Sequence, residues 1–451
     1  MTKTTALLIL GASGDLTSRL LLPALGQLLH QEPGRRIRLL GAGSDPLSAD
    51  QWSERIASAF SSSGAVAELS QVEHSTYTQA DVTDADSLRR LIEAAGGPLV
   101  IYFALPPTVT HRCCEVLSGV ELPAGTVLAL EKPFGSDVSS ARKLNELLLT
   151  LVPEERIFRV DLFLAFPTLL NILDVRFANR VFARVWNAEN VESVTIRFDE
   201  SLALEGRARY YDRAGALVDM VQSHLLQVLA LVAMEPPESS DAEHFRLAVT
   251  EVLRATRVWG GDPVAASRRA RYTAGNVGSR PVASYVDEPG VDASRHTETF
   301  TELVCEVQTE RWAGVPFRLR SGKALEAKRS TVSLQFKPVR QLAEGLSSSE
   351  SDGGQLTFSV DPDELLLELN LRGGSDPDEL VRETLTAGVG DGRLLAYSKV
   401  LSGILDGDLK LSVRADAVEE CWRIVESVRE AWARGDVPME EYEAGSLGPL
   451  R

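Results

Sequence analysis

The sequence predicts an α/β domain with a doubly wound, mostly parallel sheet, followed by an α+β domain with a large, mainly antiparallel sheet. Its 451 residues exceed what one hydrophobic core normally organises, so two domains are expected. The first third alternates short apolar runs with helical patterns, which is typical of parallel sheets. Farther along, alternating strands follow one another without regular crossover helices, which favours antiparallel pairing. We place the domains at residues 1–170 and 171–451.

Four apolar runs are predicted as strands of the first sheet. A glycine-containing turn and a helix over residues 17–30 follow the first run, and QWSERIASAF begins a helix after the second. Pro106 and Pro107 end the third strand, and Pro133 and Gly135 end the fourth, because proline cannot donate to a strand ladder. The runs are ALLIL (6–10), IRLLGAG (37–43), LVIYFAL (99–105) and TVLALEKPFG (126–135).

Six segments of alternating polarity are predicted as strands of the second sheet. An apolar helix over residues 215–234 follows the first of them. A last helix over residues 417–434 precedes a tail that we expect to be loosely ordered, and 345–355 is interpreted as a polar surface loop. The strands are VESVTIRFDE (191–200), ETFTELVCEVQ (298–308), PFRLRSG (316–322), TVSLQFKPV (331–339), LTFSVDP (356–362) and LLLELNL (365–371).

Charge and composition exclude several classes of partner. The formal net charge of -17 argues against nucleic acid and anionic membrane, although local lysines can still hold a phosphorylated small molecule. The apolar run Ala6 to Leu10 is too short for a signal peptide, and no segment is expected to reach the length of a membrane span. The cysteines lack CxxC spacing, so we predict no metal site and reduced thiols in a cytoplasmic protein: Cys113, Cys114, Cys305 and Cys421.

The start of the chain reads as strand, glycine-rich turn and helix, which is typical of dinucleotide binding. Gly11 and Gly14 let the backbone pass close to a pyrophosphate, whose charge the helix N-terminus stabilises. The spacing G-A-S-G-D departs from G-x-G-x-x-G, but its place on the first strand of a βαβ pattern favours a cofactor. Ser13, Asp15 and Leu16 complete this predicted cofactor-binding turn.

The end of the second strand bears on the choice between NAD and NADP. An acidic side chain there binds a free ribose 2′-hydroxyl, whereas an arginine accommodates a 2′-phosphate. The strand ends in GAGSDPL, with Ser44 and Asp45 and no basic residue, although Asp45 can equally be the turn residue before Pro46. The pattern therefore favours NAD over NADP, or weak discrimination between them.

Six sequence blocks span nearly the whole chain. They are GASGDLTSRLLLPAL (11–25), YFALPP (102–107), EKPFG (131–135), RFANRVFARVWN (176–187), EGRARYYDRAGALVDMVQSHLLQ (205–227) and VPFRLRSGKAL (315–325). In this order they resemble the glucose-6-phosphate dehydrogenase family. The resemblance implies a Rossmann domain, a large antiparallel α+β domain, and a homodimer or dimer of dimers. It also implies oxidation of a pyranose at C1 to a 1,5-lactone, with hydride transfer to a nicotinamide.

The resemblance assigns catalytic roles to His224, Asp161 and Lys132. His224 matches the family's base, and imidazole can take a proton near neutral pH. Asp161 matches the aspartate paired with that histidine. Asp219 precedes His224 by five residues, about 140° round an α-helix, and so cannot easily face it. Lys132 matches a lysine near the reacting centre, where a cation stabilises the developing alkoxide.

Other matched residues are assigned to substrate and cofactor. Glu200 and Asp219 match carboxylates that hold sugar hydroxyls, and Lys323 matches a substrate-side lysine. Ala104 in YFALPP and Lys132 in EKPFG lie in blocks implied to contact the cofactor.

One run departs from the family pattern. The family's R-I-D-H-Y-L-G-K-E is R-V-D-L-F-L-A-F-P here, over residues 159–167. Leu162, Phe163 and Phe166 replace a histidine, a tyrosine and a lysine that grip the substrate's 6-phosphate in the family. Each lost charge-assisted hydrogen bond costs about 1.5–3 kcal/mol, so losing three weakens phosphate binding by several orders of magnitude.

Three interpretations follow. The protein oxidises a sugar that is unphosphorylated or differently decorated at position 6, or it uses glucose 6-phosphate with the phosphate held by Arg207 or Lys323. Alternatively, it is a catalytically weak homologue that serves as a partner or regulatory subunit of a dehydrogenase. Retention of His224, Asp161 and Lys132 counts against this last interpretation. The predicted partner is therefore a small sugar or sugar phosphate.

Overall fold

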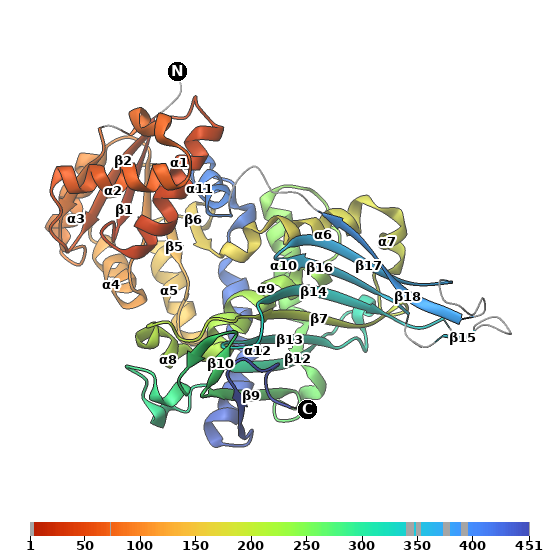
Figure 1. Ribbon diagram of the computed structural model, residues 1–451. Coiled ribbons are helices and arrows are strands. Elements are labelled where there is room, and N and C mark those ends of the chain that lie inside the picture. The colour runs from red at the N-terminus through yellow and green to blue at the C-terminus, as the bar shows by residue number, and fades with distance from the viewer. Residues whose placement is uncertain are drawn as a thin grey trace. The chain divides into compact units, whose positions relative to one another are not determined.

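The computed structural model divides into two compact units, each assembled from three segments of the chain (Figure 1). It describes residues 4–72, 74–339, 347–348, 353–372, 379–388 and 396–450. The first unit comprises Met1–Ala165, Glu238–Leu247 and Gly392–Glu419; the second comprises Phe166–Pro237, Ala248–Asp391 and Glu420–Arg451. The strictly sequential division at residue 170 stays a prediction.

The sheet of the first unit has six parallel strands in the order β3-β2-β1-β4-β5-β6, which is the Rossmann order (Figure 1). The four predicted strands are confirmed. β3 and β6 were not predicted, because TYTQ carries no apolar run and the four-residue IFRV is interrupted by Arg159. The strands are β1 (Thr5–Leu10), β2 (Ile37–Gly43), β3 (Thr76–Gln79), β4 (Leu99–Phe103), β5 (Val127–Glu131) and β6 (Ile157–Val160).

Helices follow the strands of this sheet. A capping box starts α2: the Ser48 hydroxyl accepts from the backbone N–H of Gln51 at 3.2 Å, and the Gln51 side chain accepts from the N–H of Ser48 at 2.9 Å. The helices are a π-helical turn (Thr17–Leu21), α1 (Leu22–Gln31), α2 (Ala49–Ser62), α3 (Ala85–Ala95), α4 (Pro107–Leu117), α5 (Val138–Leu151) and α11 (Ala396–Asp406), with short 3-10 turns at Val66–Gln71, Glu154–Arg156, Leu162–Ala165 and Leu409–Leu411.

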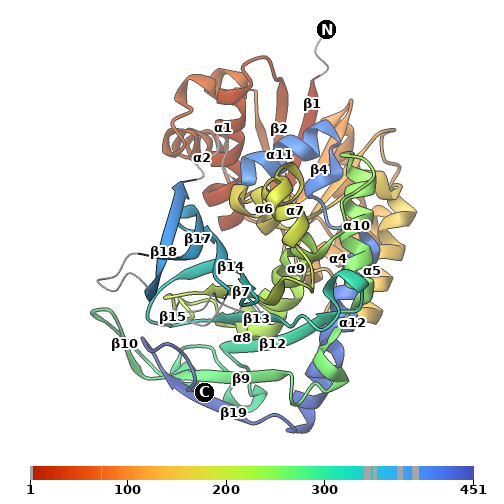
Figure 2. The same cartoon turned by 90° about the vertical axis from the view of Figure 1, so that its right-hand side faces the viewer.

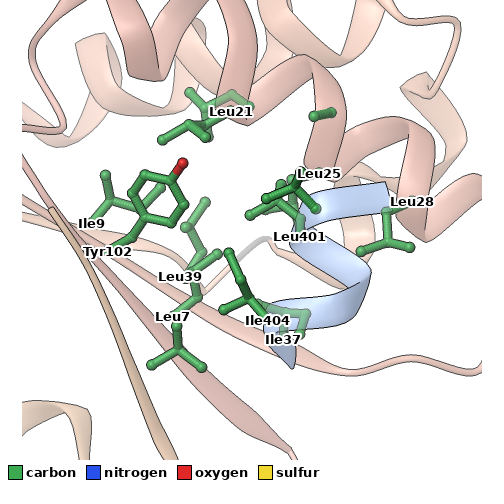
Figure 3. Close-up of a cluster of buried hydrophobic side chains, with 14 of the residues drawn as sticks. Leu7, Ile9, Leu21, Leu25, Leu28, Ile37, Leu39, Tyr102, Leu401 and Ile404 are labelled. Atoms are coloured by element: carbon green, nitrogen blue, oxygen red, sulfur yellow. The ribbon is translucent and has the colours of Figure 1, made fainter. Parts of the chain in front are cut away.

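Helix α11 completes the core of the first unit although it lies far along the chain. Figure 3 shows Leu401 and Ile404 of α11 among side chains of α1 and the parallel sheet. Both are 1% exposed. The Ser398 hydroxyl also donates to the carbonyl of Ala24 at 3.0 Å. The Rossmann core therefore requires a segment from the C-terminal part of the chain.

The second unit is built on an eleven-stranded sheet, which confirms the predicted large and mainly antiparallel sheet (Figure 2). The pairs β7–β13, β9–β19 and β15–β18 are parallel, and the remaining pairs are antiparallel. All six predicted strands are present. The sheet comprises β7 (Val191–Asp199), β8 (Thr256–Val258), β9 (Ser267–Thr273), β12 (Phe300–Val307), β13 (Phe317–Gly322), β14 (Arg329–Phe336), β15 (Ser347–Ser348), β16 (Gln355–Val360), β17 (Asp363–Arg372), β18 (Glu379–Gly388) and β19 (Met439–Glu443), and β10 (Gly275–Val277) and β11 (Arg280–Val282) form a separate hairpin.

The apolar helix of the second unit is longer than predicted. Ala208–Ala233 is long and apolar enough to cross a membrane by length and composition, so the expectation that no segment reaches that length is wrong. Burial explains the composition, since 89% of its most apolar window is inside the structure. The helices here are α6 (Pro167–Ala178), α7 (Arg180–Val185), α8 (Ala208–Ala216), a π-helical segment (Leu217–Leu225) and α9 (Leu226–Ala233); α10 (Ala242–Ala255) and α12 (Ala415–Arg434) contribute residues to both units.

The C-terminal tail is ordered, so the prediction of a loosely ordered tail is wrong. β19 pairs in parallel with β9, and Tyr442 is 4% exposed. The Tyr442 ring packs edge-on against Tyr272 and Phe300, with centroids 6.4 and 6.0 Å apart. The segment MEEYE has a single buried aromatic and no apolar run, so its pattern does not reveal a strand. The predicted loop 345–355 lies largely outside the described residues.

The four cysteines are all buried and form no disulfide, as expected for reduced structural thiols. Burial raises the pKa of Cys114 and of Cys305 to about 12, which keeps both protonated and unreactive at neutral pH.

The contribution of α11 can be tested with Leu401→Ala. Removing this side chain leaves a cavity in the Rossmann core, so we expect the free energy of unfolding to fall by about 2–4 kcal/mol. Urea denaturation followed by circular dichroism measures the change. Leu447→Ala is the matched control, because Leu447 is 59% exposed and should tolerate truncation. Equal effects of the two substitutions would contradict the packing of α11.

Candidate active site

The glycine turn lies at the carboxyl ends of β1 and β4, where strand order reverses and dinucleotides bind in this fold. Gly11 has φ +88°, and a Cβ there would lie 2.1 Å from the carbonyl oxygen of Ala104. Only glycine fits this position. The N–H of Gly14 donates to the Gly11 carbonyl at 3.0 Å, and the helix begins at Asp15. The structure thus brings the predicted turn residues together with Ala104.

The end of β2 packs against this turn. A Cβ at Gly43 would lie 2.9 Å from the Ser13 hydroxyl oxygen, so the two segments approach closely. Ser44 and Asp45 follow and are exposed. Their carbonyl groups accept hydrogen bonds from Gln79 at 2.9 Å and from the Tyr77 hydroxyl at 2.6 Å. Both predicted discriminating residues are therefore held beside the glycine turn.

Arg55 is a basic residue that sequence reasoning missed. Its Nη1 donates to the carbonyl oxygens of Ser13 at 2.5 Å and Ala12 at 3.4 Å. It lines a cavity of about 670 Å³ with Ser18 and Gln51. No basic residue directly follows β2 in the sequence, but Arg55 lies close to the glycine turn in space. The argument that a missing arginine favours NAD is therefore corrected. Arg55 follows the apolar Trp52 by three residues in a helical pattern, and this spacing could have indicated that both lie on one face of the helix.

Lys132 and Asp161 lie at the same edge of the sheet. Lys132 follows β5 and Asp161 follows β6, and these strands pair in parallel with Glu131 opposite Val160. Asp161 is 2% exposed, and its Oδ1 accepts from the N–H of Phe163 at 3.0 Å. Parallel pairing thus brings these two predicted residues to the end of the sheet that carries the glycine turn.

Glu131 is a second residue that sequence reasoning missed. Desolvation raises the pKa of its carboxyl to about 7, despite hydrogen bonds from Tyr102 and Tyr397 and the nearby Lys132 charge. The Tyr102 hydroxyl donates to Oε1 at 2.5 Å, and the Tyr397 hydroxyl is 3.5 Å away. A carboxyl that titrates near neutrality beside Lys132 is a feature of functional sites. The EKPFG block contained it, but its burial was not readable from sequence.

His224 lies in a π-helical segment, which overturns the argument about Asp219. The N–H of Leu226 bonds to the carbonyl of Val221, and the Ser223 hydroxyl donates to the carbonyl of Val218 at 2.9 Å. In a π-helix the bonded residues are five apart, so such residues lie one above the other on successive turns. The 140° separation assumed α-helical spacing and is wrong here. Asp219 and His224 are 6% and 5% exposed.

Glu200 and Lys323 are brought together by parallel pairing of β7 with β13. The register places Asp199 opposite Gly322, so the next residue of each strand falls at the same end. Lys323 forms an ion pair with Glu200 and lies over the Tyr211 ring, 5.0 Å from its centroid. The structure thus brings these two residues together, and their role in binding substrate stays a prediction.

Asp219 is linked to the Glu200–Lys323 pair through neighbouring tyrosines of α8. Arg207, by contrast, is exposed. The Tyr210 hydroxyl donates to Asp219 Oδ1 at 3.2 Å. Burial raises the pKa of the Tyr211 phenol, with Asp219 and Glu200 among the nearby charges that raise it further. Arg207 directly precedes α8. The surroundings of Lys323 are therefore acidic.

The run that departs from the family pattern starts at the end of β6. Leu162–Ala165 forms a 3-10 turn, and Phe166 precedes Pro167, the first residue of α6. Leu164 and Ala165 are buried, whereas Leu162, Phe163 and Phe166 keep partly exposed surface. These three positions therefore present apolar rather than charged surface.

A Rossmann unit with a dinucleotide turn, in one chain with an α+β unit on a large mixed sheet, defines an NAD(P)-dependent dehydrogenase as the class of protein. Residues 8–171 match the family model described as "Glucose-6-phosphate dehydrogenase, NAD binding domain". Residues 173–451 match "Glucose-6-phosphate dehydrogenase, C-terminal domain". The chain belongs to the glucose-6-phosphate dehydrogenase family.

Individual relatives match over nearly their full length. Glucose-6-phosphate 1-dehydrogenase of Gluconobacter oxydans is 35% identical, covering 98% of this chain and 94% of the relative. The Zymomonas mobilis enzyme of the same name is 34% identical, with coverage of 100% and 97%. A crystal structure of the Mycobacterium avium enzyme is 32% identical, with a TM-score of 0.85 and coverage of 100% and 96%. A glucose-6-phosphate dehydrogenase solved with glucose-6-phosphate is 27% identical, with a TM-score of 0.88 and coverage of 99% and 96%.

The environment of Glu131 predicts a pH-dependent stability. An ordinary glutamate titrates at 4.5, whereas native Glu131 holds its proton up to about pH 7. The folded state therefore binds the proton more tightly, and this stabilising contribution is lost as pH rises through 7. Glu131→Gln removes it. Between about pH 4 and pH 8, the free energy of unfolding should therefore fall more in the parent than in the variant, by on the order of 2–3 kcal/mol.

Urea unfolding at the two pH values measures this difference. Glu146→Gln on α5 is the matched control, because Glu146 is exposed. The same pH dependence in both variants would show that Glu131 ionises normally.

Proposed function

We propose that this chain oxidises C1 of a hexopyranose to the 1,5-lactone with NAD(P), and that a 6-phosphate contributes little to substrate binding. The observation that carries the proposal is the contrast within the substrate-side residues. His224, Asp219 and the Glu200–Lys323 pair are retained. The positions that grip phosphate in the family are Leu162, Phe163 and Phe166, which cannot donate side-chain hydrogen bonds or carry positive charge.

The residues of each unit suit this chemistry. In the second unit, His224 is the proposed base for the anomeric hydroxyl, and the Glu200 and Asp219 carboxylates can accept hydrogen bonds from sugar hydroxyls. In the first unit, the glycine turn leads directly into a helix that begins at Asp15, and a helix N-terminus at this position suits a dinucleotide pyrophosphate. A bound nicotinamide supplies the hydride acceptor. Lys132 is proposed to stabilise the developing alkoxide, and the pairing of His224 with Asp161 stays a prediction.

The relatives favour a second candidate, ordinary use of glucose 6-phosphate. The proteins named above are glucose-6-phosphate 1-dehydrogenases, and one is solved with that substrate. In this chain the phosphate would need a different set of donors. Lys323 is already paired with Glu200, which offsets its charge, and Arg207 is exposed. No observation favours the regulatory-subunit interpretation.

Substrate comparison tests the first candidate. We expect kcat/KM for glucose 6-phosphate to exceed that for glucose by less than about tenfold, because tenfold corresponds to about 1.4 kcal/mol and even one retained charge-assisted bond, worth about 1.5–3 kcal/mol, would exceed it. The triple variant Leu162→His, Phe163→Tyr, Phe166→Lys should raise this ratio at least about 100-fold. Steady-state formation of reduced cofactor measures both ratios. His224→Ala is the inactive control.

A parent enzyme that already prefers glucose 6-phosphate by several orders of magnitude would establish the second candidate. The triple variant would then change the ratio little, since other groups would hold the phosphate.

For the cofactor, we propose weak discrimination between NAD and NADP. The Asp45 carboxylate would accept from a free ribose 2′-hydroxyl, which favours NAD. Arg55 lies against Ser13 of the glycine turn and offers a guanidinium for a 2′-phosphate. The two groups act in opposite directions, so neither cofactor is excluded.

The role of Arg55 predicts a selective loss. Arg55→Ala should lower kcat/KM for NADP by about 10- to 100-fold, the value of one charge-assisted contact, and should change that for NAD less than threefold. Arg55→Lys keeps the charge and should retain most NADP activity. Arg90→Ala, on the exposed face of α3, is the control. Equal losses with both cofactors would show that Arg55 only supports the turn. Ser44→Arg should improve NADP use.

Assembly and location complete the proposal. A homodimer or a dimer of dimers in the cytoplasm accords with the family resemblance.

A further inference from the structure

In a chain of net charge -17, one cavity of the second unit is lined by five arginines and a single carboxylate. Its volume is about 630 Å³. The arginines come from four parts of the unit: the end of α8, the strand β9, the loop before β12, and the end of α12. They are Arg213, Arg269, Arg295, Arg429 and Arg434, and the carboxylate is Glu298. No residue assigned above to sugar or cofactor lines this cavity.

Part of this positive charge, that of Arg213 and Arg269, is not compensated by ion pairs within the described residues. Arg269 is 9% exposed, and its guanidinium donates to the neutral carbonyl of Val437 at 3.0 and 2.8 Å. Among the described residues, neither Arg269 nor the exposed Arg213 forms an ion pair. Arg295 pairs with Asp212 at 3.1 Å and with Asp292 at 3.4 Å, and Arg434 pairs with Asp436 at 2.8 Å. The cavity therefore holds an excess of positive charge, part of it desolvated.

Packing holds this arrangement in place. Arg269 lies over the ring of Trp432, 5.5 Å from its centroid, which fixes the end of α12 beside β9 (Figures 1 and 2). Asp212 accepts from Arg295, from the Tyr285 hydroxyl at 2.7 Å and from the N–H of Asp292 at 3.0 Å. The loop that carries Arg295 is thereby tied to α8. A pre-organised set of guanidinium groups loses little entropy on binding an anion.

We propose that this cavity is a second ligand site that binds a polyphosphate group, either of a nucleotide or as inorganic polyphosphate. Planar guanidinium groups match phosphate oxygens and form charge-assisted hydrogen bonds with them. The volume is far larger than one inorganic phosphate requires, and the arginines arise from several elements around it. Several linked phosphates therefore fit this set of donors better than a single one.

The same cavity contacts the start of the π-helical segment that carries His224. Gly215 and Leu217 both line it. Glu298 Oε1 accepts from the N–H of Leu217 at 2.9 Å, and its backbone carbonyl accepts from Ala216 at 3.2 Å. Burial raises the pKa of Glu298 to about 7, and Arg269 and Arg429 partly oppose the rise. A bound anion would offset those arginines, favour protonated Glu298 and weaken its hydrogen bond to Leu217.

Occupancy of this site therefore inhibits the enzyme. This part of the inference rests on the proposed function, whereas binding does not.

Calorimetric titration with tripolyphosphate tests the site, with orthophosphate and ATP as comparison ligands. We expect saturable binding of one tripolyphosphate per chain, in the presence of saturating NAD and at matched ionic strength. Arg213→Glu should weaken it at least tenfold. Arg209→Glu is the matched control, since Arg209 is exposed on the same helix and does not line the cavity.

The comparison ligands separate the sources. Tighter binding of ATP than of tripolyphosphate identifies a nucleotide, and the reverse identifies inorganic polyphosphate. Equal weakening in the two variants, or no saturation at millimolar tripolyphosphate, overturns the site.

Inhibition is tested on the same proteins. Tripolyphosphate should lower kcat at least threefold in the parent and in Arg209→Glu, but not in Arg213→Glu. Binding without any change in kcat overturns the coupling through Glu298. If the chain oxidises no sugar, the proposed function fails while calorimetry still decides whether the site exists.

Discussion

The hydrogen bond from Leu217 to Glu298 determines where the π-helical segment of the second unit begins. The Glu298 carboxylate occupies the space beside Gly215, where a Cβ would lie 2.3 Å from its Oε1. Gly215 has φ +67°, a backbone conformation that favours glycine. The chain therefore bends at Gly215 and restarts as a helix whose first free N–H is satisfied by a side chain. The placement of Asp219 and His224 depends on this restart.

The two π-helical segments described here coincide with the two predicted sites. Thr17–Leu21 follows the glycine turn, and Leu217–Leu225 contains His224. Such segments are rare and occur often at functional sites, because one extra residue per turn alters which side chains share a face. The surrounding core stabilises them. In the second unit, the π-helical segment packs on β12 and β13, the latter leading directly to Lys323.

Much of the fold was predictable because its strands have strong patterns. ALLIL and IRLLGAG are buried in a parallel sheet, and VESVTIRFDE alternates as a half-buried strand should. The short β3 and β6 and the polar β19 carry no such pattern. These strands form because they pair with neighbouring strands, and not because their own sequences favour a strand.

Most members of the candidate site were predictable, but Arg55, Glu131 and the geometry of the site were not. The glycine turn was readable because only glycine permits the approach of Gly11 to Ala104. The pairing of Glu200 with Lys323 depends on a parallel register between distant strands, which no local pattern specifies. Arg55 reaches the turn by a hydrogen bond to a backbone carbonyl, which no side-chain pattern reveals. The spacing of Asp219 from His224 depends on a π-helix, which sequence periodicity does not distinguish from an α-helix.

Helix α11 and strand β19 also have a consequence for biosynthesis. The chain leaves the ribosome from its N-terminus, yet Leu401 and Ile404 fill the core of the unit whose first strand is Thr5–Leu10. The core of the second unit likewise includes Tyr442, which packs within its aromatic cluster and is synthesised late. Neither core is complete until these segments, far along the chain, have been translated. During synthesis the nascent Rossmann unit exposes apolar side chains that α11 later covers, so protection by chaperones is most needed before α11 emerges.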